Sequence, residues 1–110
     1  MLAGFKSGLK AVWWWGLALC PFGGMAQVVP PPQVQACAVC HGPQGVALAP
    51  DAPHLAGQPS VYLISQLKAY RGGMRKHEVM SLMAKGLNDA DIETLARWYS
   101  AQRIRVDAMP

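Results

Sequence analysis

Two cysteines and a histidine in the stretch ACAVCHG constrain the fold of this chain more than any other feature. Cys37 and Cys40 are three positions apart, and His41 follows the second cysteine directly. On a helix, side chains at this spacing lie on one face. Three kinds of chemistry use such a group: a structural zinc site, a redox-active disulfide, and covalent attachment of haem. Each of them makes different demands on the rest of the sequence.

The rest of the chain favours haem over the other two uses. A structural zinc site usually takes four Cys or His ligands at other spacings, and no second C-x-x-C pair follows. A thioredoxin-like pair follows a strand in a βαβ unit, and strand-like alternation is missing here. In C-x-x-C-H, two thiols one turn apart reach the two vinyl groups on one edge of a porphyrin, and the histidine reaches the iron. We therefore predict one covalently attached haem c.

The first 26 residues have the order of a secretory signal peptide. Lys6 and Lys10 precede an apolar run over residues 11–22, and small residues lead up to Ala26. The run is about a dozen residues long, short of the roughly 20 that a membrane-spanning helix needs. We expect cleavage after Ala26 and export, which in a bacterium means to the periplasm or beyond. An uncleaved membrane anchor is the alternative.

The expected mature chain is short and mildly basic. Loss of Lys6 and Lys10 lowers the formal charge from +4 to about +2. That charge is too small to indicate nucleic acid binding, and the sequence has no basic stripe with interleaved aromatic residues. A domain of about 84 residues has a marginal core unless something reinforces it, and a large apolar cofactor would do so.

The mature chain has the pattern of a few helices joined by long loops. Residues 27–32 read as an extended proline-rich lead, residues 33–104 as one domain and residues 105–110 as a tail. Helices are expected from about Gln33 through the cysteine motif, over residues 58–73, and after Asn88, which forms a near capping box with Asp91. The segments 42–57 and 74–87 are expected to be loops. The fold class is therefore all-α.

A haem iron bound by His41 requires a partner on its other face. A methionine thioether favours ferrous iron and suits electron carriers. The methionines after the motif are Met74, Met80, Met83 and Met109. Met80 and Met83 lie on the expected loop before the last helix, which could fold over the haem, and spacing alone does not choose between them.

These segments together resemble the class I cytochromes c. The nearest kind is the small bacterial single-haem cytochrome, or one haem domain of its dihaem relatives. The resemblance covers about residues 33–102 and is carried by CAVCHG, PHLAGQPSVYLISQLKAYRGGMR and MSLMAKGLNDADIETLARWYSAQ. It implies the class I cytochrome c fold, with a few helices and long loops around one haem.

The resemblance also implies roles for single residues. Cys37 and Cys40 match the thioether anchors, His41 the proximal iron ligand and Met80 the distal ligand. Met83 falls where the family usually has isoleucine, so it is expected to pack against the haem and is the less favoured substitute as a ligand.

Further positions match residues around the ligands. Pro53 matches the proline whose carbonyl accepts the proximal histidine's Nδ1–H, a bond that fixes the tautomer. Gln58, Tyr62 and Arg75 fall at positions expected to contact the haem propionates. His54 and His77 are expected to be exposed loop residues.

The function implied is that of an exported monohaem electron carrier and not an enzyme. It would pass single electrons between redox proteins that dock transiently, without a small-molecule substrate or nucleic acid, and would be peripheral to the membrane at most. Candidates for steering an acidic partner are Lys68, Lys76, Lys85, Arg71 and Arg75. Alternatives are a peroxidase-like or gas-sensing haem domain with an open sixth position, and a fixed electron-transfer subunit of a membrane or dehydrogenase complex.

Overall fold

The computed structural model describes residues 3–4, 24 and 27–105 of the 110-residue chain. Within this described part there are four helices and no strands: α1 (Val34–His41), α2 (Ser60–Gly72), α3 (Glu78–Lys85) and α4 (Asp89–Ser100). The prediction of an all-α fold is confirmed. The predicted signal peptide lies almost entirely outside the described residues, as does most of the predicted tail.

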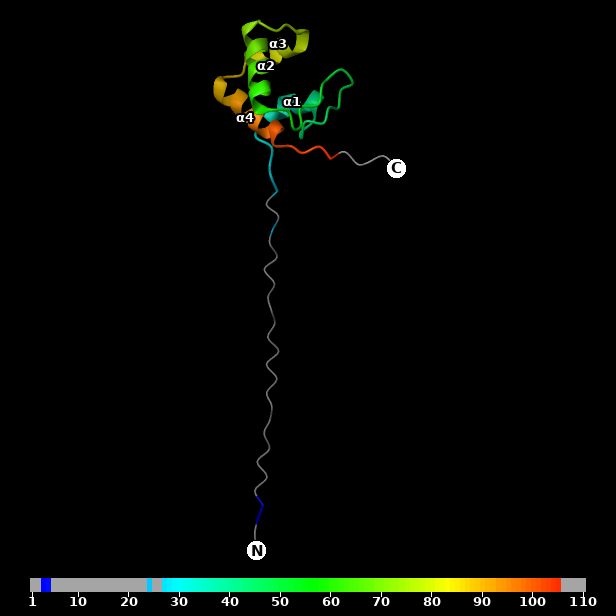
Figure 1. The fold of residues 1–110 in the computed structure, drawn as a ribbon, viewed down its shortest axis with the longest axis vertical. Coiled ribbons are helices and arrows are strands. Elements are labelled where there is room, and N and C mark those ends of the chain that lie inside the picture. The colour runs from blue at the N-terminus through cyan, green and yellow to red at the C-terminus, as the bar shows by residue number, and fades with distance from the viewer. Residues whose placement is uncertain (1–2, 5–23, 25–26, 106–110) are drawn as a thin grey trace.

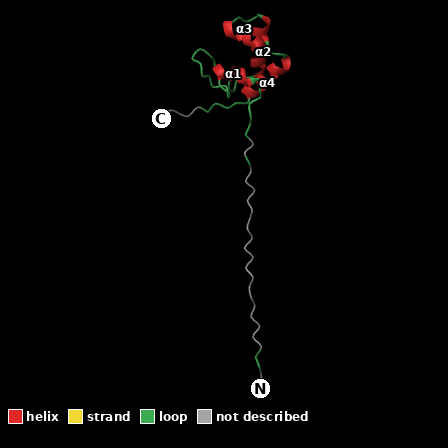
Figure 2. Cartoon of the chain, turned by 180° about the vertical axis from the view of Figure 1, so that it is seen from behind, coloured by secondary structure: helices red, strands yellow, loops and turns green. Residues whose placement is uncertain are grey.

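Helix α2 occupies the middle of the fold (Figure 1). It packs against α3 and against α4. Seen from the front and from behind (Figures 1 and 2), α3 lies at one end of the domain and α1 and α4 lie at the other. The loop that follows α1 projects beside that helix before the chain enters α2. In the described part of the chain, none of the helices has the length and apolar character that crossing a bilayer requires.

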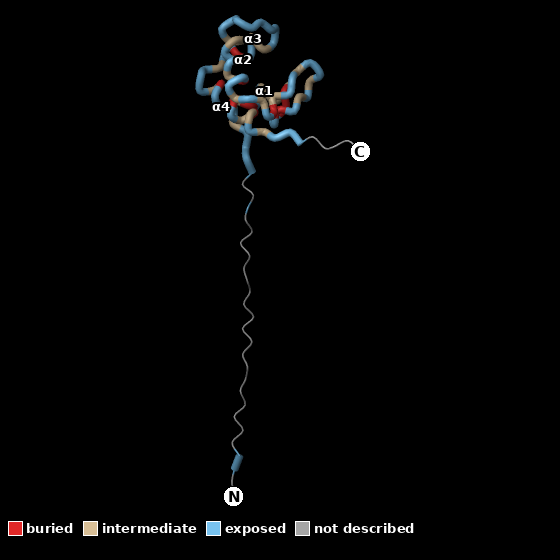
Figure 3. Tube along the Cα trace, in the orientation of Figure 1, coloured by how far each residue is buried: buried red, intermediate tan, exposed pale blue. Residues whose placement is uncertain are grey.

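The core lies where α1, α2 and α4 meet. Its buried members contact one another and are Val34, Leu63, Leu95, Ala96 and Tyr99. Figure 3 shows most of the buried segments gathered in this region. The apolar face predicted for the last helix is confirmed, because Ile92, Leu95, Ala96 and Tyr99 are the buried residues of α4. This core is small, and four of its members, Leu63, Leu95, Ala96 and Tyr99, also line an internal cavity.

The predicted helix ends are confirmed. Asn88 accepts a hydrogen bond from the N–H of Asp91 (2.8 Å), and Asp91 accepts one from the N–H of Asn88 (3.2 Å). This reciprocal pair is a full capping box. Helices α1 and α2 both end at glycines with positive φ, Gly42 at 77° and Gly73 at 80°.

The prediction of a loop over residues 74–87 is wrong, because α3 occupies Glu78–Lys85. The helix begins at His77, whose ring Nδ1 accepts hydrogen bonds from the N–H groups of Val79 and Met80. Histidine is not among the usual capping residues, so the start of α3 gave no recognisable signal in the sequence. Met80 therefore lies on a helix, as does Met83 one turn later.

Candidate haem-binding site

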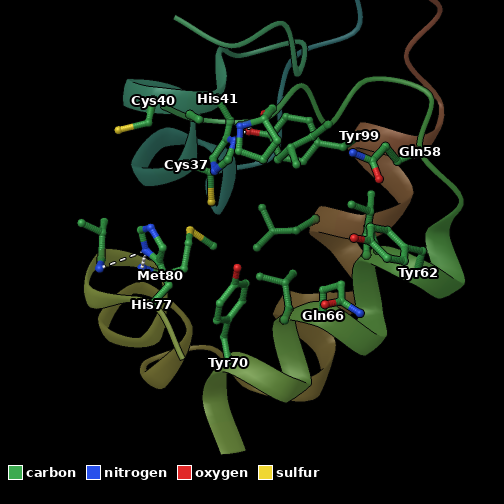
Figure 4. Close-up of a pocket in the computed structure, with 18 of the residues that line it drawn as sticks. Cys37, Cys40, His41, Gln58, Tyr62, Gln66, Tyr70, His77, Met80 and Tyr99 are labelled. Atoms are coloured by element: carbon green, nitrogen blue, oxygen red, sulfur yellow. Dashed lines mark hydrogen bonds between the residues drawn. The ribbon is translucent and has the colours of Figure 1, made fainter. Parts of the chain in front are cut away.

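A cavity of about 360 Å³ lies between α1 with its following loop on one side and α2 with α3 on the other (Figure 4). A volume of this size is typical of small-molecule sites. Met83 is outside the lining, and every other residue assigned to the haem site lines it: Cys37, Cys40, His41, Pro53, Gln58, Tyr62, Arg75 and Met80. The fold thus brings together residues from α1, the loop, α2 and α3.

Helix α1 presents Cys37, Cys40 and His41 at one wall of the cavity. Both cysteines are half-buried and have free thiols. The helix ends directly after His41, because Gly42 adopts a positive φ that side chains rarely take, and a Cβ there would collide with the carbonyl of Val46. The chain then turns back, and the N–H groups of Leu48 and Ala49 donate to the carbonyl of Cys40 (2.8 and 3.1 Å).

His41 is held in one orientation by a backbone carbonyl. Its side chain lies in the interior, with the residue 7% exposed, and Nδ1 lies 2.9 Å from the carbonyl oxygen of Pro53. A carbonyl only accepts hydrogen bonds, so Nδ1 carries the hydrogen, and in the neutral imidazole Nε2 then carries the lone pair. Within the described residues no protein donor or acceptor bonds to Nε2. The imidazole is therefore in the tautomer that a metal ligand requires.

The loop after α1 is fixed at the place where it must present Pro53. The carbonyl of Gly45 accepts hydrogen bonds from the N–H groups of Leu55 (2.8 Å) and Ala56 (3.1 Å). One residue further, the N–H of Gly57 donates to the carbonyl of Tyr99 on α4 (3.0 Å). The bonds to Gly45 close the loop on itself, and the bond from Gly57 ties its end to α4, so the position of the Pro53 carbonyl depends on contacts beyond its neighbours in sequence.

The structure separates the methionines that spacing alone left equivalent. Met80 lines the cavity, and Figure 4 shows its side chain pointing towards Cys37 of α1. Met74 is 89% exposed and Met83 is 39% exposed, and neither lines the cavity. Met109 lies outside the described residues. Of the described methionines after α1, Met80 alone offers its thioether to the space that His41 faces.

The three polar residues expected near the propionates lie along the cavity wall, each in a different setting. The amide of Gln58 donates to the carbonyl of His54 (2.7 Å). Tyr62 is exposed at the edge of α2. Arg75 donates to Oε1 of Gln66 (2.6 Å), and its guanidinium lies over the ring of Tyr70, 4.7 Å from the centroid. Their contact with propionates stays a prediction.

Sequence reasoning missed Gln66, Tyr70 and His77 as lining residues. Tyr70 is one turn beyond Gln66 on the same face of α2. The signal was the i, i+4 continuation of Tyr62, a polar stripe beside the apolar one. His77 had no such signal. It is exposed as expected, but it caps α3 instead of standing free in a loop.

Two titratable groups at the cavity wall, Cys37 and Tyr99, have a shifted pKa, and burial is the main cause in both. Desolvation raises the pKa of the Cys37 thiol. Desolvation, followed by the nearby Cys37, raises the pKa of Tyr99 beyond its usual range. Both groups are therefore neutral at physiological pH in the protein as described. The Tyr99 hydroxyl keeps its hydrogen and donates it to the carbonyl of Gly42 (3.3 Å).

Of the cations proposed to steer a partner, several are engaged within the fold. Arg71 pairs with Asp89 (2.7 Å) and also donates to the carbonyl of Leu87 (3.0 Å). Lys68 lies 4.0 Å from the same carboxylate. Within residues 27–105, Lys76 and Lys85 have no ion pair. They border a shallow surface groove between the end of α2 and α3.

Comparison with known proteins finds relatives that are named as cytochromes c or as an electron acceptor. The chain is 47% identical over 73 residues to cytochrome c-554(548) of Halomonas halodenitrificans, a match over 64% of this chain and 88% of that protein. It is 42% identical over 66 residues to cytochrome c4 of Thiocapsa roseopersicina, over 60% of this chain and 34% of that protein.

A third relative is the thiosulfate dehydrogenase electron acceptor of Thiomonas intermedia. It is 44% identical over 71 residues, which are 64% of this chain and 33% of that protein. The chain therefore spans most of the first relative and about a third of the other two. No protein-family profile matches the chain.

The chain belongs to the class I c-type cytochromes. It is an electron-transfer cytochrome whose cofactor is covalently attached haem c. The residues around the cavity fit that cofactor. Two free thiols, an imidazole nitrogen with a lone pair and a thioether face one space, and apolar side chains such as Leu63 and Leu95 form its walls.

Proposed function

We propose that this cytochrome is an exported carrier of single electrons and not an enzyme, with His41 and Met80 as the axial ligands of its haem iron and Cys37 and Cys40 as its thioether anchors. The observation that carries the proposal is the position of Met80. It comes from α3, across the cavity from α1, while Met83 and Met74 lie outside the lining. A closed sixth position is what distinguishes a carrier from a peroxidase-like or gas-binding domain.

Bound haem supplies one-electron exchange between Fe(II) and Fe(III). The protein's part is to hold and tune the site. The Pro53 carbonyl orients the His41 ring and holds the hydrogen on Nδ1 (Nδ1 to oxygen, 2.9 Å), which would leave Nε2 for the iron. The thioether of Met80 stabilises the ferrous state relative to a harder ligand. Leu63 and Leu95 line the cavity and would exclude water from its inner wall, and we expect Gln58, Tyr62 and Arg75, which also line it, to meet the propionates.

The partners we propose are redox proteins that dock transiently. One relative is named as the electron acceptor of thiosulfate dehydrogenase, which makes an exported dehydrogenase a reasonable class of donor to test. In the described part Lys76 and Lys85 have neither an ion pair nor a side-chain hydrogen bond, whereas Arg75, which also lacks an ion pair, is held by Gln66 and the ring of Tyr70. Lys76 and Lys85 are therefore the better candidates for steering an acidic partner.

The proposed place of work is the bacterial periplasm. Residues 1–26 would direct export and be removed, leaving the lead 27–32, the haem domain 33–104 and the tail 105–110. Mass spectrometry of the exported protein tests this layout, since it gives both the position of cleavage and the number of haems. Retention of residues 1–26 would favour the alternative of an anchored subunit.

Paired substitutions test the ligand assignment. The oxidised protein should show the weak near-infrared band of sulfur-to-iron charge transfer. Met80→Ala should abolish that band, and Met83→Ala, the matched control one turn further along α3, should keep it. The reverse outcome would refute Met80 as the ligand. Ready binding of carbon monoxide to the untreated ferrous wild type would favour a sensor or peroxidase-like domain instead.

A further inference from the structure

The first turn of α3 has an unusual cap. Nδ1 of His77 accepts hydrogen bonds from the N–H groups of Val79 (3.3 Å) and Met80 (3.2 Å). In return, the N–H of His77 donates to Oγ of Ser81 (3.1 Å), and the N–H of Ser81 donates to the carbonyl of His77 (2.9 Å). One side chain thus satisfies two of the N–H groups that a helix start leaves without partners, and one of them belongs to Met80.

The ring of His77 is also held against α2. It meets the ring of Tyr70 edge to face, with centroids 6.4 Å apart and an interplanar angle of 74°. Tyr70 also contacts Arg75, whose guanidinium lies 4.7 Å from the ring centroid and donates to Gln66 (2.6 Å). The start of α3 is therefore linked to α2 through three side chains. Figure 4 shows His77 beside Met80, at the cavity wall formed by α3.

Helix α3 depends on such contacts because it is short and buries little of its surface. It has eight residues, and a helix of that length is not stable by itself in water. Ala84 is its only buried residue, and it lies near the far end of the helix from Met80. Little apolar packing therefore holds the first turn, and the cap and the ring contact with Tyr70 hold it instead.

We propose that His77 is a positioning residue for Met80. By capping the turn that carries Met80 and by packing on Tyr70, it keeps the thioether directed into the cavity, so that the sixth position of the haem iron stays closed to other ligands. This inference rests on the proposed role of Met80 as the distal ligand. It assigns no bond between His77 and the haem.

The test uses the full holoprotein with three variants. His77→Ala removes the cap, His77→Asn replaces it with a side chain that also caps helices well, and Asn88→Ala removes a comparable cap from α4, where it touches no cavity residue. The readouts are the affinity of the ferric protein for added imidazole, which competes with the thioether, and the intensity of the near-infrared sulfur-to-iron band.

His77→Ala should bind imidazole about fivefold more tightly, since loss of a cap costs a helix about 1 kcal/mol, and its near-infrared band should weaken. His77→Asn should restore both readouts towards wild type. Asn88→Ala should lower stability to urea by a similar amount and leave both readouts unchanged. Equal imidazole affinities for His77→Ala and Asn88→Ala would overturn the proposal, as would failure of His77→Asn to rescue.

A measurement on the wild type covers the case in which His77→Ala fails to assemble. Hydrogen exchange of the ferrous holoprotein should show the amides of Val79 and Met80 exchanging at least about tenfold more slowly than that of Glu78, which precedes them in the same turn. Equal exchange rates for these three amides would refute the role of His77 as the cap. The two proposals fail separately: a band that survives Met80→Ala removes the ligand assignment, whereas a band lost in Met80→Ala but unaffected in His77→Ala removes only the role of His77.

Discussion

Replacement of Gly45 by alanine should destabilise the domain severely, because two independent costs meet at this residue. Gly45 has a φ of 81°, a conformation that residues with a side chain rarely adopt. A Cβ built there would lie 2.5 Å from the backbone nitrogen of Ala56 and 2.9 Å from Cδ1 of Tyr99. Neither neighbour is the end of a flexible chain, so the backbone of the loop would have to move.

The expected size follows from these two costs. A left-handed conformation costs a non-glycine residue about 1 kcal/mol or more, and overpacking a close contact costs about 1–3 kcal/mol. Gly45→Ala should therefore lose about 2–4 kcal/mol of unfolding free energy, which for a domain of this size lowers Tm by about 8–32 °C. Because the Gly45 carbonyl binds Leu55 and Ala56, the segment that presents Pro53 to His41 should shift as well.

The assay is urea unfolding of the holoprotein followed by far-ultraviolet circular dichroism. The matched control is Gly86→Ala. Gly86 has a φ of −82°, and a Cβ there would meet nothing within 4 Å. Such a substitution should be neutral or stabilise by about 0.4–1 kcal/mol, through the unfolded state. If Gly45→Ala and Gly86→Ala unfold at the same urea concentration, the argument from backbone conformation and close approach is wrong.

Two further predictions concern the core and the surface. Leu95→Ala should lower the unfolding free energy by about 2–5 kcal/mol, because the residue is 1% exposed. Val61→Ala, at a position 77% exposed, should change it by less than about 0.5 kcal/mol. Similar losses for the two variants in urea unfolding would contradict the assigned core. The hydrogen bond from Arg71, then the charge of Lys68, lowers the pKa of Asp89. Because the pKa of this carboxyl is lower in the folded than in the unfolded protein, its ionised form stabilises the fold at pH values above the ordinary pKa. That stabilisation is lost as the pH falls through the pKa of the folded protein. Wild type should therefore lose slightly more stability than Asp89→Asn between roughly pH 5 and pH 3, and parallel curves would argue against the pair.

Much of this protein could be predicted because its strongest signals are local. The capping box of Asn88 and Asp91 lies within four consecutive residues, and its geometry needs nothing from the rest of the fold. The same holds for the glycines that end α1 and α2, and for the spacing of the cysteines on one helical turn. The all-α class followed from these signals and from the absence of strand-like alternation.

The sequence did not predict helix α3, and this failure has a specific cause. A histidine ring nitrogen replaces the expected hydroxyl or carboxylate at the start of that helix, and its geometry is held by Tyr70 from α2. No rule based on neighbouring residues anticipates a cap that depends on a ring fixed by another helix. The engagement of Arg71 with Asp89 was missed for a similar reason, since the pair joins α2 to the start of α4.

The sequence by itself determined the chemistry that this chain offers: two thiols and an imidazole on one turn, several thioethers downstream, and well-marked ends for three of the helices. The tertiary structure decided which of those groups meet. It turned Met80 inward and left Met83 and Met74 outside, and it brought the Pro53 carbonyl to His41 through bonds to Gly45 and α4. The physical reason is that side-chain type and helix phase are local properties, whereas direction into a shared cavity depends on how distant segments pack.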